Sequence, residues 1–196
     1  MMPPRLIVIT GPAAAGKSTL SRELQSQLTR DGELWLVLEL DVFARGLPRD
    51  WVSLGTHRGR HAERGFVYAR AQDGGIELGI GVDGRRVLAG FHRTVAAVVR
   101  SGIGVICETI VYDQDDRNDW AEALGDMPAF WVKLDAPLAV LEAREAADRT
   151  RVLRGLARGM TARASVGRHD FEADSAADSA SSIARRIVAS MRSSQP

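Results

Sequence analysis

The sequence predicts one α/β domain, with a mostly parallel sheet of five strands and helices on both faces. Two observations predict this fold class. Four short, mainly apolar runs, and a short fifth strand expected over 171–173, alternate along the chain with segments of helical periodicity, the order that builds a parallel sheet. The 196 residues also contain no internal repeat and no linker that would divide them, so 1–196 is expected to form a single domain.

The first two strands and the helix between them are the clearest elements. Residues 6–9 are apolar at consecutive positions, as in a strand covered on both faces, and 35–38 repeat the pattern. Between them, a glycine-rich turn leads into a helix in which Leu20, Leu24 and Leu28 share one face. The order strand, helix, strand predicts a parallel pair joined by a right-handed crossover.

The stretch 45–75 departs from this alternation. It shows no clean period, and we expect a long excursion with a short helix over 62–71. Segments of this length without regular structure often serve as lids or binding elements. Residues 76–87 alternate across Asp83-Gly84, which predicts a hairpin with a two-residue turn.

The remainder of the chain returns to the α/β order. We expect helices over 88–100, 113–124, 137–147 and 181–191, and strands over 103–107, 130–134 and 171–173. The arginine-rich segment 148–163 is expected to act as a lid, and the tail 192–196 to fray.

Composition excludes several classes of protein. The 26 basic residues nearly balance the 25 acidic ones, whereas a nucleic-acid-coating protein would be lopsided. Cys107 is the only cysteine, so no intrachain disulfide can form. No apolar run reaches the length of a signal-peptide core or a membrane span. We therefore expect a cytoplasmic protein without a nucleic-acid or membrane partner, and a homo-oligomer remains open.

One motif carries the functional argument. Gly11-Pro12-Ala13-Ala14-Ala15-Gly16-Lys17-Ser18 matches G-x-x-x-x-G-K-[ST], the loop that binds nucleotide phosphates. Its glycines let successive backbone N–H groups point at one anion, and the helix that follows adds its N-terminal dipole. Lys17 would reach the β- and γ-phosphates, and the Ser18 hydroxyl would bind Mg²⁺. The motif and Thr19 after it therefore predict an ATP site, against the alternative of a glycine-rich turn that binds nothing.

Two acidic residues follow buried strands. Asp41 comes at the carboxyl end of the second strand, where open parallel sheets bind ligands, and it could accept the proton of an attacking hydroxyl. It could equally be the N-cap of a short helix that begins at Val42. Glu108 ends the third strand, where an acidic residue holds magnesium in proteins with this loop. Its alternative is a solvated carboxylate at the end of a strand.

Four arginines lie on and after the helix that follows the fourth strand. An arginine fork can stabilise the charge of a transferring phosphoryl group when a lid closes over it. Because Lys17 and Lys133 are the only lysines among the 26 basic residues, arginine is abundant here, and a solvated face competes with this role. The candidates are Arg144, Arg149, Arg151 and Arg154.

Together these segments resemble the chloramphenicol phosphotransferase family of small P-loop kinases. The resemblance covers most of the chain and includes the loop 11–18 and the segments 35–41, 73–77, 142–145, 151–152 and 170–175. It implies a fold like that of nucleotide kinases and transfer of the ATP γ-phosphate to a hydroxyl of the antibiotic. It also implies that Asp41 is the general base and that Arg144 and Arg151 are the lid arginines.

The resemblance has departures on the acceptor side. This chain has Cys107-Glu108-Thr109 where the family tends to have paired aspartates, and its excursion 45–75 is longer than the family's. The acidic loop 113–116 also differs. It could favour a cationic acceptor, or it could simply line the N-terminus of a helix.

The leading hypothesis is an ATP- and Mg²⁺-dependent kinase that phosphorylates a hydroxyl on a small molecule, an antibiotic among the candidates. One alternative is a kinase of nucleotides or metabolites. The other is a nucleotide-switched regulator without turnover, although the guanine-reading N-K-x-D pattern is absent because Val132 precedes Lys133.

Overall fold

A five-stranded parallel sheet forms the centre of the molecule, as the alternating pattern predicts. The computed structural model describes residues 5–30, 32–148, 153–161 and 166–193. Every strand pair in this sheet is parallel. The strands lie in the order β2 (Trp35–Glu39), β7 (Gly104–Glu108), β1 (Leu6–Thr10), β8 (Phe130–Asp135), β9 (Phe171–Asp174).

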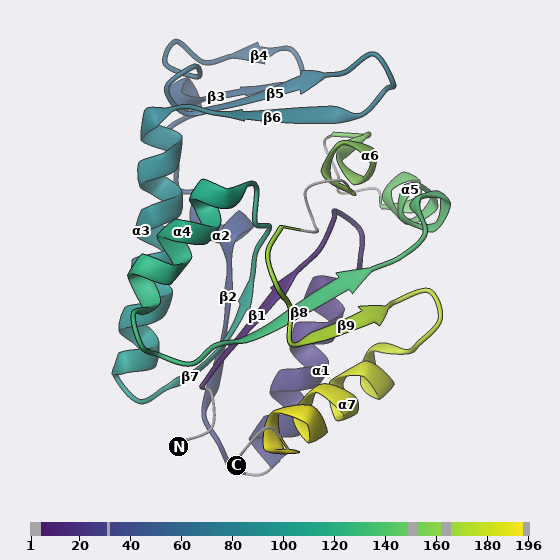
Figure 1. The fold of residues 1–196 in the computed structure, drawn as a ribbon. Helices are drawn as coiled ribbons and strands as arrows, with labels where there is room; N and C mark the ends of the chain where they lie inside the picture. The colour runs from purple at the N-terminus through teal and green to yellow at the C-terminus, as the bar shows by residue number, and fades with distance from the viewer. Residues whose placement is uncertain (1–4, 31, 149–152, 162–165, 194–196) are drawn as a thin grey trace.

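Helices cover both faces of this sheet (Figure 1). On one face lie α1 (Lys17–Arg30) and α7 (Ala180–Ser193), which pack on each other, and on the other face lie α3 (Val82–Arg100) and α4 (Gln114–Leu124). Side-chain alternation in β1 explains the two layers. Leu6 and Val8 join the core with α3 and α4, whereas Ile7 and Ile9 join the core with α1 and α7. All four are fully buried, which is why the run is uninterrupted in the sequence.

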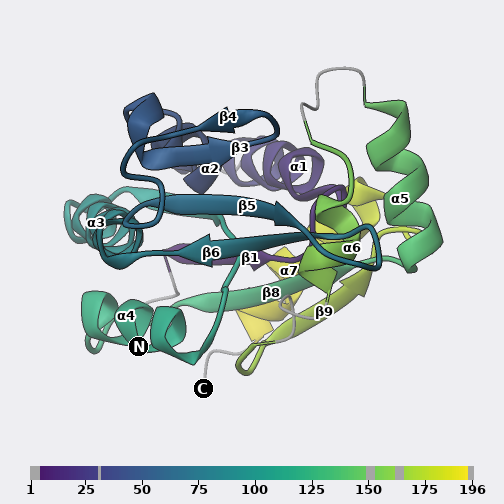
Figure 2. The same cartoon turned by 90° about the horizontal axis from the view of Figure 1, so that it is seen from above.

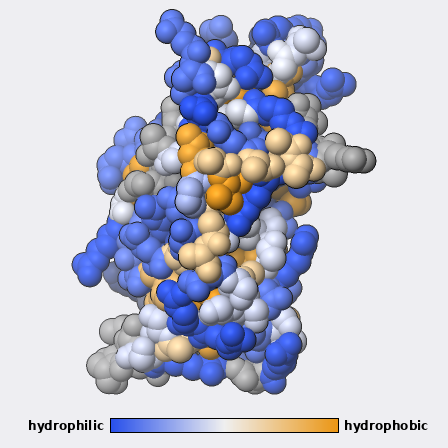
Figure 3. Space-filling view, turned by 90° about the vertical axis from the view of Figure 1, so that its right-hand side faces the viewer, coloured by the Kyte–Doolittle hydropathy of each residue, from blue (hydrophilic) through white to orange (hydrophobic). Residues whose placement is uncertain are grey.

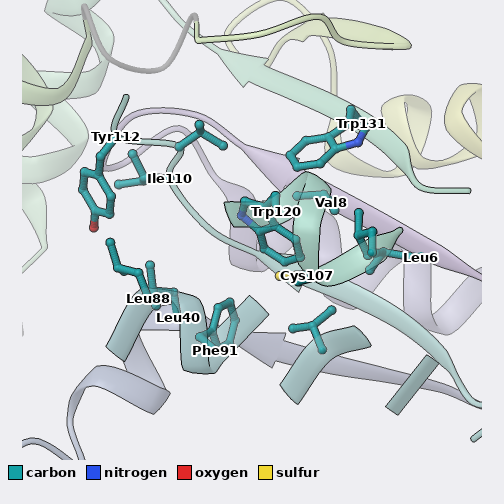
Figure 4. Packing of buried hydrophobic residues seen from close by; sticks show 14 of the residues in the cluster. Leu6, Val8, Leu40, Leu88, Phe91, Cys107, Ile110, Tyr112, Trp120 and Trp131 are labelled. Carbon is teal, nitrogen blue, oxygen red and sulfur yellow. The ribbon is translucent and has the colours of Figure 1, made fainter. Parts of the chain in front are cut away.

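The core under α3 and α4 is aromatic. Trp120 is fully buried and meets the rings of Phe91 and Trp131 edge-on, with centroids 6.3 Å and 5.7 Å away. Figure 4 shows Trp120 between Val8 of the sheet and Phe91 of α3, with Cys107 beside them. Cys107 is a buried small hydrophobe, and burial raises the pKa of its thiol well above the ordinary value.

A second sheet replaces the irregular excursion expected over 45–75. Its strands are β4 (His57–Arg58), β3 (Val52–Leu54), β5 (Phe66–Arg70) and β6 (Ile76–Ile80), in that order. It follows α2 (Leu40–Ala44) and the 3-10 turn η1 (Arg49–Trp51). Figures 1 and 2 show it lying across one end of the molecule, above the parallel sheet and at the start of α3.

The short helix expected over 62–71 is wrong. Residues 66–70 pair antiparallel with 76–80, and the actual hairpin turn is 71–75, closed by the N–H of Ala71 donating to the carbonyl of Gly75. Gly74 has φ of 84°, the left-handed conformation that glycine adopts freely. Pairing with β3 and β6 determines the conformation of this segment, and the local hydrophobic periodicity does not indicate that pairing.

The hairpin expected across Asp83-Gly84 is also wrong, because α3 already begins at Val82. The N–H groups of Asp83 and Gly84 both donate to the carbonyl of Arg64, which satisfies the first turn of the helix. A Cβ on Gly84 would lie 2.5 Å from the carbonyl oxygen of Gly65. Glycine is therefore required at 84 for close packing, and not for a turn.

Two further expectations need correction. The first two strands are parallel within one sheet but are not paired, since β7 lies between them. As the edge strand, β2 is only partly buried, with Leu36 37% exposed. At the other end of the chain, α7 runs to Ser193, so Arg192 and Ser193 are helical where fraying was expected.

Two more helices lie between β8 and β9 along the chain. α5 (Leu138–Ala147) follows β8, and α6 (Leu156–Thr161) lies in the arginine-rich segment expected as a lid. A Cβ on Gly159 would come 1.9 Å from the carbonyl oxygen of Ile76, so α6 packs directly on β6, as Figure 2 also shows.

Viewed from the right-hand side of Figure 1, apolar side chains gather at mid-height, below the largely hydrophilic end (Figure 3). No described helix has both the length and the hydropathy of a transmembrane span.

Candidate active site

The loop 11–18 connects β1 to α1 and has the backbone of an anion cradle. Gly11, Ala14 and Gly16 all have positive φ, at 154°, 64° and 94°. A Cβ on Gly11 would lie 2.0 Å from the carbonyl oxygen of Leu134, so only glycine lets the loop approach β8 this closely. This curl and the N-terminus of α1 place backbone N–H groups around one concave point, which suits a phosphate.

Lys17 and Ser18 emerge from the start of α1. The Lys17 ammonium folds over the loop and donates to the carbonyls of Gly11 (2.9 Å) and Pro12 (3.0 Å). The Ser18 hydroxyl donates to the Glu108 carboxylate, with 2.8 Å between Oγ and Oε2. The structure therefore brings together the serine and the acid that the sequence predicted as magnesium ligands, although they are 90 positions apart in the chain.

Glu108 is buried rather than solvated. Its side chain is 6% exposed, and its Oε1 atom has no hydrogen-bond partner in the part of the chain that the structure describes. Burial raises the pKa of this carboxyl, and the hydroxyls of Ser18 and Ser21 oppose the shift. The charge of Glu39 adds to it, and that of Lys17 opposes it. An unpaired carboxylate oxygen beside a hydroxyl, both next to the phosphate loop, fits a hard cation with oxygen ligands such as Mg²⁺.

No described group of three or more His, Cys, Asp or Glu side chains could hold a metal alone. Magnesium sites that bind nucleotides use one or two protein oxygens, and phosphates and water supply the other ligands.

Asp41 lies in the first turn of α2. The helix begins at Leu40 with Glu39 at its N-cap position, so the interpretation of Asp41 as the N-cap is wrong. The Asp41 side chain is exposed and faces the space between the loop and the second sheet. Its place at the carboxyl edge of the parallel sheet is the one predicted for a general base, and that role stays a prediction.

Arg144 lies on α5 beside the phosphate loop. Its guanidinium donates to the Ser175 hydroxyl and carbonyl, both at 2.8 Å, and approaches the Ala14 carbonyl at 3.4 Å. These contacts fix a cation at the edge of the loop. Arg149 and Arg151 lie outside the described residues. Arg154 is exposed and lines neither of the two cavities described below.

A cavity of about 360 Å³, the loop cavity, runs from the phosphate loop toward the second sheet. Residues 13–19, Asp41, Glu108 and Arg144 all line it. Gly11 and Pro12 do not line it, and their carbonyls instead hold Lys17. Seven of the nine residues expected to bind nucleotide therefore line one cavity together with the candidate base and the candidate metal ligand Glu108.

A second cavity of about 660 Å³, the apolar cavity, shares part of its lining with the loop cavity and extends beneath the second sheet. Its lining is mostly aliphatic and aromatic, including Val52, Leu54 and Phe66 of the small sheet, with Arg45, Arg49 and His57 among its polar groups. The residues that line both cavities are Leu40, Asp41, Tyr68, Tyr112, Asp148 and Leu156.

Sequence reasoning missed Tyr68 and Tyr112. They are the only tyrosines of the chain, and both lie at the junction of the two cavities. Burial and the nearby Asp41 carboxylate raise the pKa of Tyr68 to about 12, so its hydroxyl is a hydrogen-bond donor at neutral pH. Their rarity was the one available signal, because their convergence depends on the second sheet and on the loop after β7.

The acidic loop 113–116 is used inside the fold. Asp113 caps α4 by accepting from the N–H of Asp116, and it pairs with Arg85 of α3. Asp116 is 1% exposed. The loop was expected either to favour a cationic acceptor or to line the N-terminus of a helix, and Asp113 does the second. Asp115 is the one exposed aspartate of the three in this loop.

Comparisons with known proteins identify the family and the fold. A family model described as chloramphenicol phosphotransferase-like protein matches residues 4–192. A search of curated protein sequences found no match.

Among solved structures, the chain is similar to the Mycobacterium tuberculosis APS kinase in complex with AMPPNP and APS (17% identity, TM-score 0.62, 97% of this chain and 99% of that chain). It is also similar to shikimate kinase from Acinetobacter baumannii in complex with shikimate (16%, 0.57, 100% and 96%). A third is the tunicamycin resistance protein of Deinococcus radiodurans (16%, 0.56, 94% and 94%). At these identities the likeness shows the fold, and it confirms the predicted P-loop kinase architecture.

Proposed function

The chain belongs to the chloramphenicol phosphotransferase-like family, and from that premise we propose that it transfers the γ-phosphate of ATP to a hydroxyl of a small, largely apolar acceptor. Family membership and the P-loop kinase fold support a kinase role. The observation that carries the finer proposal is the joined pair of cavities. The loop cavity contains the phosphate loop, the apolar cavity could hold an acceptor, and Asp41 lines both.

The residues of the loop cavity divide the work. Backbone N–H groups of the loop would bind the β- and γ-phosphates, and the Lys17 ammonium would leave the Gly11 and Pro12 carbonyls to neutralise them. Ser18 Oγ and the Glu108 carboxylate would hold Mg²⁺, which when bound offsets phosphate charge. Arg144, already fixed by Ser175, would contact the transferred group or the nucleotide at the edge of the loop.

Asp41 would serve as the general base. Its carboxylate would accept the proton of the acceptor hydroxyl while that oxygen forms a bond to the γ-phosphorus. The bond from the γ-phosphorus to the β,γ-bridging oxygen breaks, and ADP leaves with that electron pair. Proximity of the acceptor to the nucleotide supplies much of the rate, because the reacting groups are held in one continuous space.

The lining of the apolar cavity favours the acceptor class. A sugar or nucleotide would place some of its hydroxyls against the aliphatic part of this lining, at a cost of about 1–3 kcal/mol for each polar group left unpaired. An antibiotic with an apolar body and one or two hydroxyls avoids that cost. We therefore propose an antibiotic such as chloramphenicol as the first acceptor to test.

The test is a panel of hydroxylated compounds assayed for ADP release, with the product identified by mass as the phosphate ester. The panel contains chloramphenicol, tunicamycin, shikimate, a hexose and a nucleoside. Turnover of an apolar antibiotic supports the proposal, and turnover of only the metabolites would assign a metabolite kinase. Hydrolysis of ATP at the same rate with and without every compound would contradict an acceptor kinase and favour a nucleotide-switched regulator.

A further inference from the structure

A buried polar group lies behind the two cavities and has no part in the proposed reaction. His92 of α3 and Asp116 and Trp120 of α4 are 0%, 1% and 0% exposed. The His92 ring stacks on Trp120 with centroids 4.2 Å apart, and its Nε2 is 3.3 Å from Asp116 Oδ1. Burying two ionisable side chains is expensive, and apolar residues of similar volume would serve stability as well or better.

The geometry of this group is not that of a fully satisfied network. Among the described residues, both ring nitrogens of His92, Asp116 Oδ1 and Trp120 Nε1 have no well-aligned hydrogen-bond partner. Helix capping does not explain Asp116, because the cap of α4 is already supplied by Asp113. A function for the buried carboxylate therefore has to come from its remaining contact.

That contact reaches the junction of the cavities. Asp116 Oδ2 accepts a hydrogen bond from the backbone N–H of Tyr112 at 3.0 Å. Tyr112 is 8% exposed, and it lines both the loop cavity and the apolar cavity. In Figure 4 its ring lies beside Ile110 and across from Leu88, a residue of α3 that also lines the apolar cavity.

We propose that Asp116 is a positioning residue for the acceptor site. It holds the backbone at Tyr112, and the His92 ring of α3 packs against Asp116, so that the Tyr112 ring forms a fixed wall where the acceptor meets the nucleotide. The inference rests on the proposed function, since it takes the apolar cavity to be the acceptor site. It predicts that Asp116 controls acceptor binding without contacting the acceptor.

Charge on Asp116 adds a pH dependence to this contact. Burial raises the pKa of Asp116 to about 6 and lowers that of His92 to about 3, so at neutral pH a carboxylate faces a neutral imidazole. The hydrogen bond from the Tyr112 N–H opposes the upward shift of the Asp116 pKa, as does Arg85, whereas Asp113 and Asp119 add to it. Arg93 adds to the downward shift of the His92 pKa. A protonated Asp116 accepts the Tyr112 N–H more weakly, because charge-assisted hydrogen bonds are the stronger ones.

The first arm of the test reads Tyr112 directly and needs no acceptor. Because the chain has two tyrosines, 3-fluorotyrosine labelling gives two ¹⁹F resonances, which Tyr112→Phe assigns. We expect Asp116→Ala to shift or broaden the Tyr112 resonance, and Asp115→Asn, an exposed change in the same helical turn, to leave it unchanged. In the unsubstituted protein this resonance should titrate in the acid range, and in Asp116→Asn it should not.

The second arm measures kinetics with chloramphenicol and the other compounds of the panel. Asp116→Ala should raise the acceptor KM by about tenfold or more, the effect of losing a hydrogen bond to a charged group, with the ATP KM within about twofold. Asp116→Asn keeps an oxygen for the Tyr112 N–H and should restore the acceptor KM at pH 7.5. If Asp116→Ala does not fold, the pH titration of Asp116→Asn against the unsubstituted protein decides instead.

Each outcome is decisive. An unchanged Tyr112 resonance in Asp116→Ala overturns the proposal, as does an equal rise in both KM values, which would mean general damage. If the unsubstituted protein phosphorylates no compound, the proposed function fails, and the acceptor role of Asp116 is overturned with it. The ¹⁹F arm then shows separately whether Asp116 positions Tyr112.

Discussion

Replacing Gly11 by alanine tests whether the phosphate loop has the conformation described above. An alanine there would place its Cβ 2.0 Å from the carbonyl oxygen of Leu134, while ordinary contact begins near 3.4 Å. Its φ of 154° is also one that residues with a side chain rarely adopt. The loop must therefore move by more than 1 Å, or β8 must give way.

The magnitude follows from these two terms. Backbone strain contributes about 1–3 kcal/mol and overpacking about 1–3 kcal/mol, so Gly11→Ala should destabilise the protein by about 2–6 kcal/mol. Gly16→Ala has a φ of 94° but no atom within 4 Å of the new Cβ, so only strain applies. Gly90→Ala, inside α3 with open space, should stabilise the protein by up to about 1 kcal/mol.

Urea denaturation of the three variants without ligand measures these differences, and calorimetry with Mg-ATP measures binding in parallel. We expect the order of stability Gly90→Ala, unsubstituted protein, Gly16→Ala, Gly11→Ala, and the weakest binding in Gly11→Ala. The reasoning is refuted if Gly11→Ala is as stable as the unsubstituted protein to within about 0.5 kcal/mol, the usual range for a surface substitution.

Three further predictions follow from the site. Asp41→Asn should lower kcat by about 10²–10⁴-fold, as expected for loss of a general base, with the ATP dissociation constant nearly unchanged; near-normal kcat would remove Asp41 from that role. Glu108→Gln should weaken Mg-ATP binding by about tenfold or more. The pKa of Glu108 is raised in the folded protein, so any contribution of this carboxyl to stability is lost as the pH rises. In urea denaturation at pH 8, Glu108→Gln should therefore be at least as stable as the unsubstituted protein. A clear destabilisation would contradict the unpaired-carboxylate geometry. The pKa of Asp116 is about 6 in the folded protein and ordinarily 3.8. The contribution of protonated Asp116 to the free energy of unfolding is therefore fully present below pH 3.8 and is lost as the pH rises through about 6. The stability of the unsubstituted protein relative to Asp116→Asn should therefore fall by about 2 kcal/mol between pH 4 and pH 7, and a difference that does not vary with pH would contradict this burial.

The parallel sheet was predictable because its central strands are buried on both faces. Residues 6–9 and 105–107 must be apolar throughout, and such runs are visible without knowledge of their partners. The phosphate loop was predictable for a similar reason, since its chemistry resides in one continuous segment. Glu108 could be placed because the end of a parallel strand lies at a known edge of the sheet.

The second sheet could not be predicted in the same way. Its strands are short, the strand 66–70 pairs with both 52–53 and 76–80, and its sides are only partly covered. The Asp83-Gly84 pair led to a wrong hairpin prediction, because in the sequence a glycine that permits close packing cannot be distinguished from one that makes a turn. The junction of the cavities escaped prediction for the same reason, since Tyr68 belongs to that sheet.

The buried role of Asp116 was invisible for a different reason. A run of aspartates at the start of a helix indicates a solvated, charge-stabilised N-terminus, and Asp113 and Asp115 fit that description. Only packing against His92 distinguishes the third aspartate, and His92 lies 24 positions earlier on another helix.

Titration calorimetry of the purified protein with ATP and magnesium tests most directly whether the loop after β1 is a triphosphate site. We predict saturable binding at one site per chain, with affinity in about the 1 μM–1 mM range of enzyme substrates, and its loss in Lys17→Ala. A folded protein that takes up no Mg-ATP, in the presence or absence of every compound of the panel, would contradict the nucleotide site and the kinase function with it.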